Sequence, residues 1–280
     1  MSMVGPLLRT LGRNLLQYLV APEGEELASH QLKAGVELRS SGQDGNTSIT
    51  CRGDPGATAE TRNLIRALTQ ALDADEKERS GGYFEEILGM SGMSGRKYRR
   101  LINRMISLSR APRYLEVGSW AGSTACSAIH GNRVEMTCID NWSEFGGPKD
   151  VFLANVAAAS NAGVVFSFIE SDFRKVDFSA IGRFNVYLFD GPHSRQDQYD
   201  GVRLAQPALA DTFVLIVDDW NWEQVRSGTF DAIADEKLRL HLSVEIRTTL
   251  DNSHAPQTME NSDWHNGYFL CVCRKPRARN

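Results

Sequence analysis

Two apolar runs in the second half of the sequence end in residues that could do chemistry. The polar residues that follow them are Asp190-Gly-Pro-His193 and Asp218-Asp219. Carboxylates that converge on one site repel one another and need a counter-charge to stay ionised. Oxygen ligands of this kind suit Mg²⁺. The three aspartates are therefore predicted to hold a metal ion, the alternative being one helix cap and one solvent-facing side chain.

His193 lies three positions after the first of these aspartates. An unperturbed imidazole has a pKa of about 6.5, which fits a general base at neutral pH. We expect His193 to be catalytic, and a histidine in an ordinary surface loop is the alternative.

A tight glycine turn follows an earlier apolar run at residues 114–117. It reads Gly118-Ser-Trp-Ala-Gly122 and opens onto a helical pattern. Glycines let a backbone approach a ligand closely, but the same pattern fits dinucleotide-binding folds and structural turns. Glu116, just before the loop, is costly to bury without a partner. A cofactor amino group would supply one, and capping of local backbone amides is the alternative.

Acidic residues also end the next two apolar runs. Asp140 is placed to accept both hydroxyls of a ribose, a contact that adenosine-type and nicotinamide cofactors share. Asp172 is placed either for an adenine edge or for a helix cap. The predicted cofactor-binding residues are Glu116, Gly118, Ser119, Trp120, Gly122, Ser123, Asp140, Asn141, Trp142, Asp172 and Asp190.

Four tryptophans come just after strand-like runs, at the edge where ligands of an α/β sheet lie. They are Trp120, Trp142, Trp220 and Trp222. Because the indole ring stacks on planar groups and cations, we expect these side chains to line the site. Packing in the core is the alternative for any one of them.

The elements that must position these residues are predicted from residue 113 onward, where short apolar runs alternate with helical patterns. The runs are 114–117, 134–139, 164–169, 186–189 and 213–217, and the helices are 123–130, 148–162, 194–209 and 222–240. Stretches 242–248 and 268–273 close the chain as an expected antiparallel pair. The fold class is α/β: a doubly wound, Rossmann-like, seven-stranded, mostly parallel sheet with an antiparallel C-terminal strand and a helical N-terminal extension.

The chain is predicted to divide into residues 1–110, a mainly helical extension, and residues 111–280, the cofactor-binding domain. Helices are expected at 61–72 and 98–108, and a loop or irregular hairpin at 40–61. Residues 80–95 fit a lid or a plain linker. The leucine-rich N-terminus is expected to pack on its own domain or on a second subunit rather than to lie on a membrane surface. A homo-oligomer formed through this region is therefore possible.

Composition narrows the function classes. A net charge of -4 argues against bulk binding of nucleic acid, and the basic stretch 96–100 is interpreted as solvated helix charges. The five cysteines show no Cys-x-x-Cys spacing, so neither a zinc site nor a disulfide framework is indicated and a reducing cytoplasm is expected. No apolar run reaches the length of a membrane span.

Together these motifs resemble the class I S-adenosylmethionine-dependent methyltransferase superfamily over residues 110 to 275. The segments that carry the resemblance are Tyr114-Leu-Glu-Val-Gly-Ser-Trp-Ala-Gly-Ser-Thr, Cys138-Ile-Asp-Asn-Trp, Phe189-Asp-Gly-Pro-His-Ser and Val217-Asp-Asp-Trp. The second half of the pattern is similar to metal-dependent O-methyltransferases that act on sugar hydroxyls of macrolide-type natural products.

The resemblance implies that S-adenosylmethionine is the cofactor, that Asp190, Asp218 and Asp219 hold Mg²⁺, and that His193 takes a proton from a small-molecule hydroxyl. Two departures stand out: Ser119-Trp120 replaces a second glycine that many members carry, and the first hundred residues match no pattern of the superfamily. The acceptor is therefore open. The rival functions are a nicotinamide-dependent oxidoreductase and a non-catalytic domain that binds nucleoside ligands or partner proteins.

Overall fold

The structure is a computed structural model that describes residues 36–39, 48–53, 58–72, 82–256 and 258–276. Its centre is a sheet with the strand order β1-β2-β8-β9-β7-β6-β3-β4-β5. The strands are β1 (Val36–Arg39), β2 (Ser48–Gly53), β3 (Arg113–Val117), β4 (Val134–Asp140), β5 (Val164–Glu170), β6 (Phe184–Phe189), β7 (Leu209–Val217), β8 (Arg239–Arg247) and β9 (Tyr268–Arg274).

The seven strands β3–β9 form the predicted sheet. Strands β5, β4, β3, β6 and β7 pair in parallel. Strand β9 lies antiparallel between β7 and β8, which confirms the expected closing pair. Chain order reverses between β3 and β6, so the loops that follow these two strands flank the topological switch point where open α/β sheets bind ligands.

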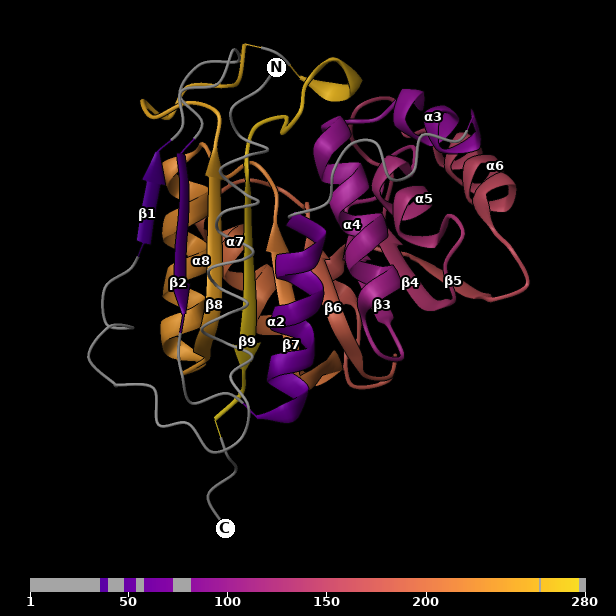
Figure 1. Cartoon of the computed structure of the whole chain (residues 1–280). Helices are drawn as coiled ribbons and strands as arrows, with labels where there is room; N and C mark the ends of the chain where they lie inside the picture. Colours follow the sequence, from indigo (N-terminus) through magenta and orange to yellow (C-terminus); the bar gives the residue numbers. More distant parts are fainter. Residues whose placement is uncertain (1–35, 40–47, 54–57, 73–81, 257, 277–280) are drawn as a thin grey trace.

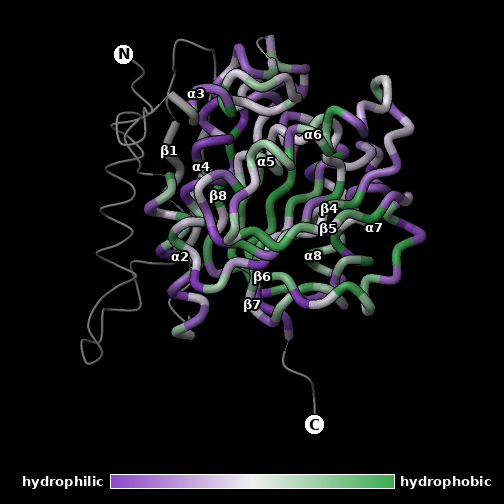
Figure 2. Tube along the Cα trace, turned by 90° about the vertical axis from the view of Figure 1, so that its right-hand side faces the viewer, coloured by the Kyte–Doolittle hydropathy of each residue, from purple (hydrophilic) through white to green (hydrophobic). Residues whose placement is uncertain are grey.

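Helices cover both faces of the sheet, as a doubly wound fold requires (Figure 1). One face carries α2 (Ala59–Leu72), α3 (Gly82–Gly89), α4 (Arg96–Leu108), α5 (Ser123–Ile129) and α6 (Lys149–Ala159). The other face carries the short 3-10 turn η1 (Phe173–Lys175) with α7 (Arg195–Leu204) and α8 (Glu223–Asp235). Hydrophobic residues gather along the central strands and hydrophilic residues in the outer segments (Figure 2).

The fold class is confirmed, with differences at particular elements. The described part of the first 110 residues holds three helices but also the antiparallel hairpin of β1 and β2, which extends the sheet beyond β8. Helices α2 and α4 pack in the same core as the strands. The predicted helix 222–240 ends at Asp235, and β8 begins at Arg239. The division of the chain at residue 110 stays a prediction.

One arginine of the basic stretch 96–100 is not solvated as expected. Arg99 is fully buried. Its guanidinium donates to the carbonyl oxygens of Ile87, Leu88, Met90 and Gly92 and to the Ser94 hydroxyl. The segment after α3 is thereby held on the domain.

The leucine-rich N-terminus and most of the 40–61 stretch lie outside the described residues. No helix in the described part of the chain is long and apolar enough to cross a membrane.

Candidate active site

A cavity of about 550 Å³ opens at the carboxyl ends of the parallel strands. It is lined by the loops that follow β3, β4, β5, β6 and β7, and by the segment between β8 and β9. The predicted site residues that line it are Gly118, Trp120, Asp140, Asn141, Trp142, Asp172, Asp190, His193, Asp218 and Asp219. The predicted residues Glu116, Ser119, Gly122 and Ser123 are absent from its lining.

The glycine loop at the end of β3 packs directly against the end of β6. Gly118 has φ +84°, and a Cβ at this position would lie 1.8 Å from the carbonyl oxygen of Asp190. A side chain is therefore excluded both by the backbone conformation and by the close approach of the two strands. Gly122, with φ +88°, is the N-cap of α5. Gly118 thus lets the neighbouring ends of β3 and β6 come together, whereas a Cβ on Gly122 would meet the Phe152 ring of α6.

Asp140 at the end of β4 fastens the glycine loop. Its Oδ2 accepts hydrogen bonds from the backbone amides of Ser119 and Trp120, at 2.7 and 2.9 Å. Its Oδ1 accepts from the amide of Trp142 at 2.7 Å. Each carboxylate oxygen can accept two hydrogen bonds, so Oδ1 keeps capacity toward the pocket that it lines. The side chain predicted to bind a ribose therefore also shapes the loop.

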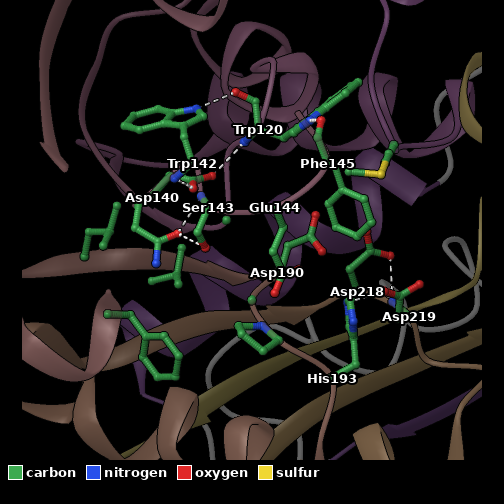
Figure 3. A pocket seen from close by; sticks show the side chains of 18 of the residues that line it. Trp120, Asp140, Trp142, Ser143, Glu144, Phe145, Asp190, His193, Asp218 and Asp219 are labelled. Carbon is green, nitrogen blue, oxygen red and sulfur yellow. Dashed lines mark hydrogen bonds and ion pairs between the residues drawn. The ribbon is translucent and has the colours of Figure 1, made fainter. Parts of the chain in front are cut away.

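Two tryptophans and an exposed phenylalanine form one wall of the pocket (Figure 3). The indole N–H of Trp142 donates to the Trp120 carbonyl, and the indole N–H of Trp120 donates to the Phe145 carbonyl, each at 2.9 Å. All three residues have positive φ, between +43° and +50°. Bulky residues rarely adopt this conformation, and these hydrogen bonds help to hold it.

Backbone strain is concentrated at this pocket. Nine non-glycine residues of the described chain have positive φ, and six of them line the cavity: Trp120, Trp142, Phe145, Asp219, Met259 and His265. Such conformations cost on the order of 1–3 kcal/mol each and cluster at functional sites. Their distribution supports the pocket as the working part of the molecule.

Glu116 lies beneath the pocket rather than in its wall. The carboxyl group is fully buried, and its Oε2 accepts a 2.5 Å hydrogen bond from the Tyr114 hydroxyl. Its partner in the structure is thus a side chain two residues earlier on the same strand, and the contact with a cofactor amino group stays a prediction. Burial raises the pKa of Glu116 to about 7, against the opposing effect of the Tyr114 hydrogen bond.

Asp172 and Asn141 are used locally. Asp172 accepts from the backbone amide of Arg174 and caps η1, which is the second of its two predicted roles. The Asn141 side chain accepts from the amide and the hydroxyl of Ser143 within its own turn. Both residues still line the pocket.

A carboxylate–imidazole cluster occupies the other side of the cavity (Figure 3). Ligand atoms of Asp190, His193 and Asp219 lie within 4.8 Å of one another. The contact between Nε2 of His193 and Oδ2 of Asp219 is 2.6 Å. Asp218 lies outside this triad, and its Oδ1 accepts from the backbone amide of Asp219 at 2.7 Å. The predicted residues therefore converge, and His193 rather than Asp218 completes the group of three possible ligands.

The cluster shifts the pKa values of its members in opposite directions. Burial and the Asp219 charge raise the pKa of Asp190 to about 8. Burial and the Asp190 charge raise the pKa of Asp218. Burial would also raise that of Asp219, but His193 and Asn266 lower it below its usual value. Burial lowers the pKa of His193, but Asp219 outweighs burial and the net shift is upward.

Several lining residues were missed by the sequence analysis. They come from the segment between β8 and β9 and are His254, Thr258, Met259 and His265. The amide of Asn266, next to them, donates to Asp219 at 2.8 Å. Because β9 runs antiparallel, its beginning lies at the edge where the parallel strands end. These residues precede a strand instead of following one, so the rule for parallel strands does not find them. The predicted antiparallel pair did indicate that the start of the last strand lies at this edge.

Trp220 does not belong to the site. It is fully buried, its ring stacks on Phe269 at 4.4 Å, and its indole N–H donates to Glu245. For Trp220, the alternative of packing in the core is therefore confirmed. The other three tryptophans of the prediction line the pocket.

Comparisons with known proteins give a family match over part of the chain. Residues 115–220 match the family model described as "Methyltransferase domain". No curated protein sequence matches the chain.

Solved structures with a similar fold include TrmN from Thermus thermophilus, which is 14% identical with a TM-score of 0.40 over 64% of this chain and 49% of its own. A methyltransferase from Podospora anserina bound to S-adenosylhomocysteine is 12% identical with a TM-score of 0.45, over 79% and 89% of the two chains. A ribosomal protein L11 methylase from Lactobacillus delbrueckii subsp. bulgaricus is 12% identical with a TM-score of 0.44, over 64% and 78%. The matched part of this chain thus spans about half the length of TrmN.

Proposed function

We propose that this chain, whose residues 115–220 match the methyltransferase-domain family model, transfers a methyl group from S-adenosylmethionine to a hydroxyl of a small molecule. The observation that carries the proposal is that the glycine loop and the carboxylate–imidazole cluster open into the same cavity. A methyl donor held at the loop would then face an acceptor held at the cluster, and such alignment is a large part of the acceleration of a two-substrate reaction.

The donor side of the cavity fits an adenosine-type cofactor. Asp140 offers a carboxylate oxygen at the end of β4, and Ile139, Trp142 and Phe173 supply apolar surface around it. When bound, S-adenosylmethionine supplies an activated methyl group. The residues of this chain bind it and orient it.

The acceptor side fits a divalent cation. Oxygen atoms of Asp190 and Asp219 are close enough to bind one ion together, and Mg²⁺ prefers such oxygen ligands. We propose that Asp190 and Asp219 hold the ion and that Asp218, the third aspartate of the prediction, supports Asp190 through a side-chain hydrogen bond. When bound, Mg²⁺ lowers the pKa of a hydroxyl, as metal ions do for water.

His193 is proposed as the general base. Its pKa is raised by the Asp219 carboxylate at 2.6 Å, despite the opposing effect of burial, so the ring is a stronger base than a free imidazole. The same Nε2 atom belongs to the candidate metal group. A ring nitrogen that ligates a metal has no lone pair left for a proton. Nε2 can therefore act as the general base only when it is not bound to the ion.

Titration of the purified protein with S-adenosylhomocysteine and with NAD, each with and without Mg²⁺, tests the proposal. We expect S-adenosylhomocysteine to bind with a dissociation constant in the micromolar range, and we expect NAD not to bind. Binding of NAD instead would favour an oxidoreductase, since the loop and acid pattern is shared by both classes. Binding of neither would refute the proposed methyl transfer. A direct titration with Mg²⁺ that shows no binding to the protein would refute the metal part alone.

A further inference from the structure

Asn266 lies just before β9 and connects the carboxylate cluster to neighbouring buried segments of the chain. The residue is fully buried. Its Nδ2 donates to Oδ1 of Asp219 at 2.8 Å. Its Oδ1 accepts from Nδ2 of Asn221 at 2.9 Å and from the backbone amide of Ala255 at 3.0 Å. One amide group therefore joins the loop after β7 to both ends of the connection between β8 and β9.

The orientation of this amide follows from its neighbours. The backbone N–H of Ala255 can only donate, so the atom of Asn266 that faces it must be the oxygen. The nitrogen must then face Asp219. Asn221 strengthens this assignment, because its own Oδ1 accepts from the backbone amides of Thr248 and Thr249 and its nitrogen is left to face Asn266.

The two oxygens of Asp219 consequently have different partners. Oδ1 accepts from Asn266, and Oδ2 lies 2.6 Å from Nε2 of His193. Asp219 itself has φ +57°, a conformation that persists only where surrounding contacts hold it. The contact with Asn266 fixes one end of the carboxylate, so the other end is aimed at His193.

We propose that Asn266 is a positioning residue, which by donating to Oδ1 of Asp219 holds Oδ2 toward His193 and Asp190. This inference rests on the proposed function for its consequence, because the group it orders is the one assigned to the metal and the base. Partners that orient metal ligands from behind typically change metal affinity or activity about 10–100-fold when they are removed.

The test compares Asn266→Ala with Thr248→Val, using Mn²⁺ as the probe ion and the ¹⁵N signal of His193 Nε2 at one fixed pH. The signal is assigned with His193→Gln. Thr248 belongs to the same network, where its hydroxyl accepts from Asn221 and donates to the His265 carbonyl, but it does not contact Asp219. We expect Asn266→Ala to weaken Mn²⁺ binding about tenfold or more and to move the His193 signal. Thr248→Val should leave both nearly as in the wild type.

A second variant keeps the test decisive if Asn266→Ala fails to fold. Asn266→Asp keeps an oxygen that accepts from Asn221 and Ala255 but replaces the nitrogen that donates to Asp219 by a second oxygen, while Asp219 itself stays in place. We expect this variant to fold, to bind Mn²⁺ more weakly than the wild type and to move the His193 signal. Wild-type Mn²⁺ affinity together with an unchanged His193 signal in this variant would overturn the proposal.

Two other results would also overturn the role of Asn266. One is wild-type Mn²⁺ affinity together with an unchanged His193 signal in Asn266→Ala. The other is an equal loss of both readouts in Thr248→Val. If the wild-type protein binds no Mn²⁺, the metal part of the proposed function fails, and the His193 signal alone then decides whether Asn266 positions Asp219.

Discussion

The His193–Asp219 pair joins two titratable side chains in the cavity wall that carries the carboxylates. Its 2.6 Å separation couples the two charge states. Burial disfavours both ions, yet the pKa of His193 is raised and that of Asp219 is lowered because each stabilises the other. At this scale, the chemistry depends on which partner the ring has.

His193→Ala and Asp219→Asn should each reduce methyl transfer about 100-fold or more, the usual contribution of general acid–base catalysis. The rate of product formation on a verified acceptor measures this loss. Asp211→Asn, which alters an exposed carboxylate outside the pocket, is the matched control. Methyl transfer left intact in the first two variants would contradict the metal-and-base mechanism.

Asp190 should make the metal-free protein less stable as the pH rises. Its pKa is raised to about 8, first by burial and then by the Asp219 charge, whereas an unfolded aspartate titrates near 3.9. Between these values the folded state binds the extra proton, so the free energy of unfolding falls with increasing pH.

Asp190→Asn removes this penalty and should raise the melting temperature, by several degrees more at pH 8 than at pH 5. Thermal unfolding in the presence of EDTA measures the difference, and about 2–4 °C correspond to 1 kcal/mol in a chain of this size. A gain that is equal at both pH values would contradict the raised pKa.

At the scale of elements, the glycine loop depends on one residue for its approach to β6. Gly118→Ala places a Cβ 1.8 Å from the Asp190 carbonyl oxygen, so the two strand ends must separate. We expect loss of S-adenosylhomocysteine binding and a destabilisation of about 3 kcal/mol or more.

Gly131→Ala is the control for Gly118→Ala. Gly131 also has positive φ, but no atom lies within 4 Å of the added Cβ. Its cost is therefore limited to backbone strain of about 1 kcal/mol, and binding should be unaffected. Calorimetry and denaturant unfolding measure both variants, and equal effects would show that the close approach to β6 is unimportant.

Arg99 ties the segment after α3 to α4 and, through Ser94, to the start of α5. The Ser94 hydroxyl lies 2.9 Å from that of Ser123, and Met93 from the same segment lines the pocket. Arg99→Met should lower the free energy of unfolding by about 3 kcal/mol or more, because buried carbonyl oxygens lose their donors.

Arg100→Met is the matched variant for Arg99→Met. Arg100 makes an exposed ion pair with Glu85, and such pairs contribute about 0–1 kcal/mol. Urea unfolding should therefore separate the two neighbouring arginines clearly. Similar losses would mean that the buried hydrogen bonds of Arg99 add little.

At the scale of the whole molecule, the sheet and its two helical layers enclose the thiols. All four cysteines with described side chains are buried: Cys126, Cys138, Cys271 and Cys273. Burial raises the pKa of Cys126 to about 12, and only thiolates react readily.

The native protein should therefore react with a disulfide reagent at one thiol at most, and the unfolded protein at all five of its cysteines. A spectrophotometric titration with and without guanidinium measures both numbers. Rapid reaction of two or more native thiols would show that the core opens far more readily than its packing indicates.

Much of the sheet could be predicted from local patterns. The predicted runs at residues 114–117 and 186–189 lie within strands β3 and β6. They could be recognised because strands buried on both faces are continuously apolar. The convergence of Asp190 and Asp219 followed from the rule that parallel strands end at one edge. The end of α8 was less predictable, because neither its helical nor its strand pattern is strong near residue 236.

Sequence by itself determined the α/β class, the order of the strands that end in polar residues, and the side chains available at their common edge. Only the tertiary structure decided how those side chains are paired. Packing buries Trp220 and Arg99 and pairs Glu116 with Tyr114. It also brings Asn266 to the cluster and His265 to the pocket from the segment just before the antiparallel strand β9. Periodicity reports which face of an element is buried, whereas these pairings join residues far apart in the chain and depend on how whole elements pack.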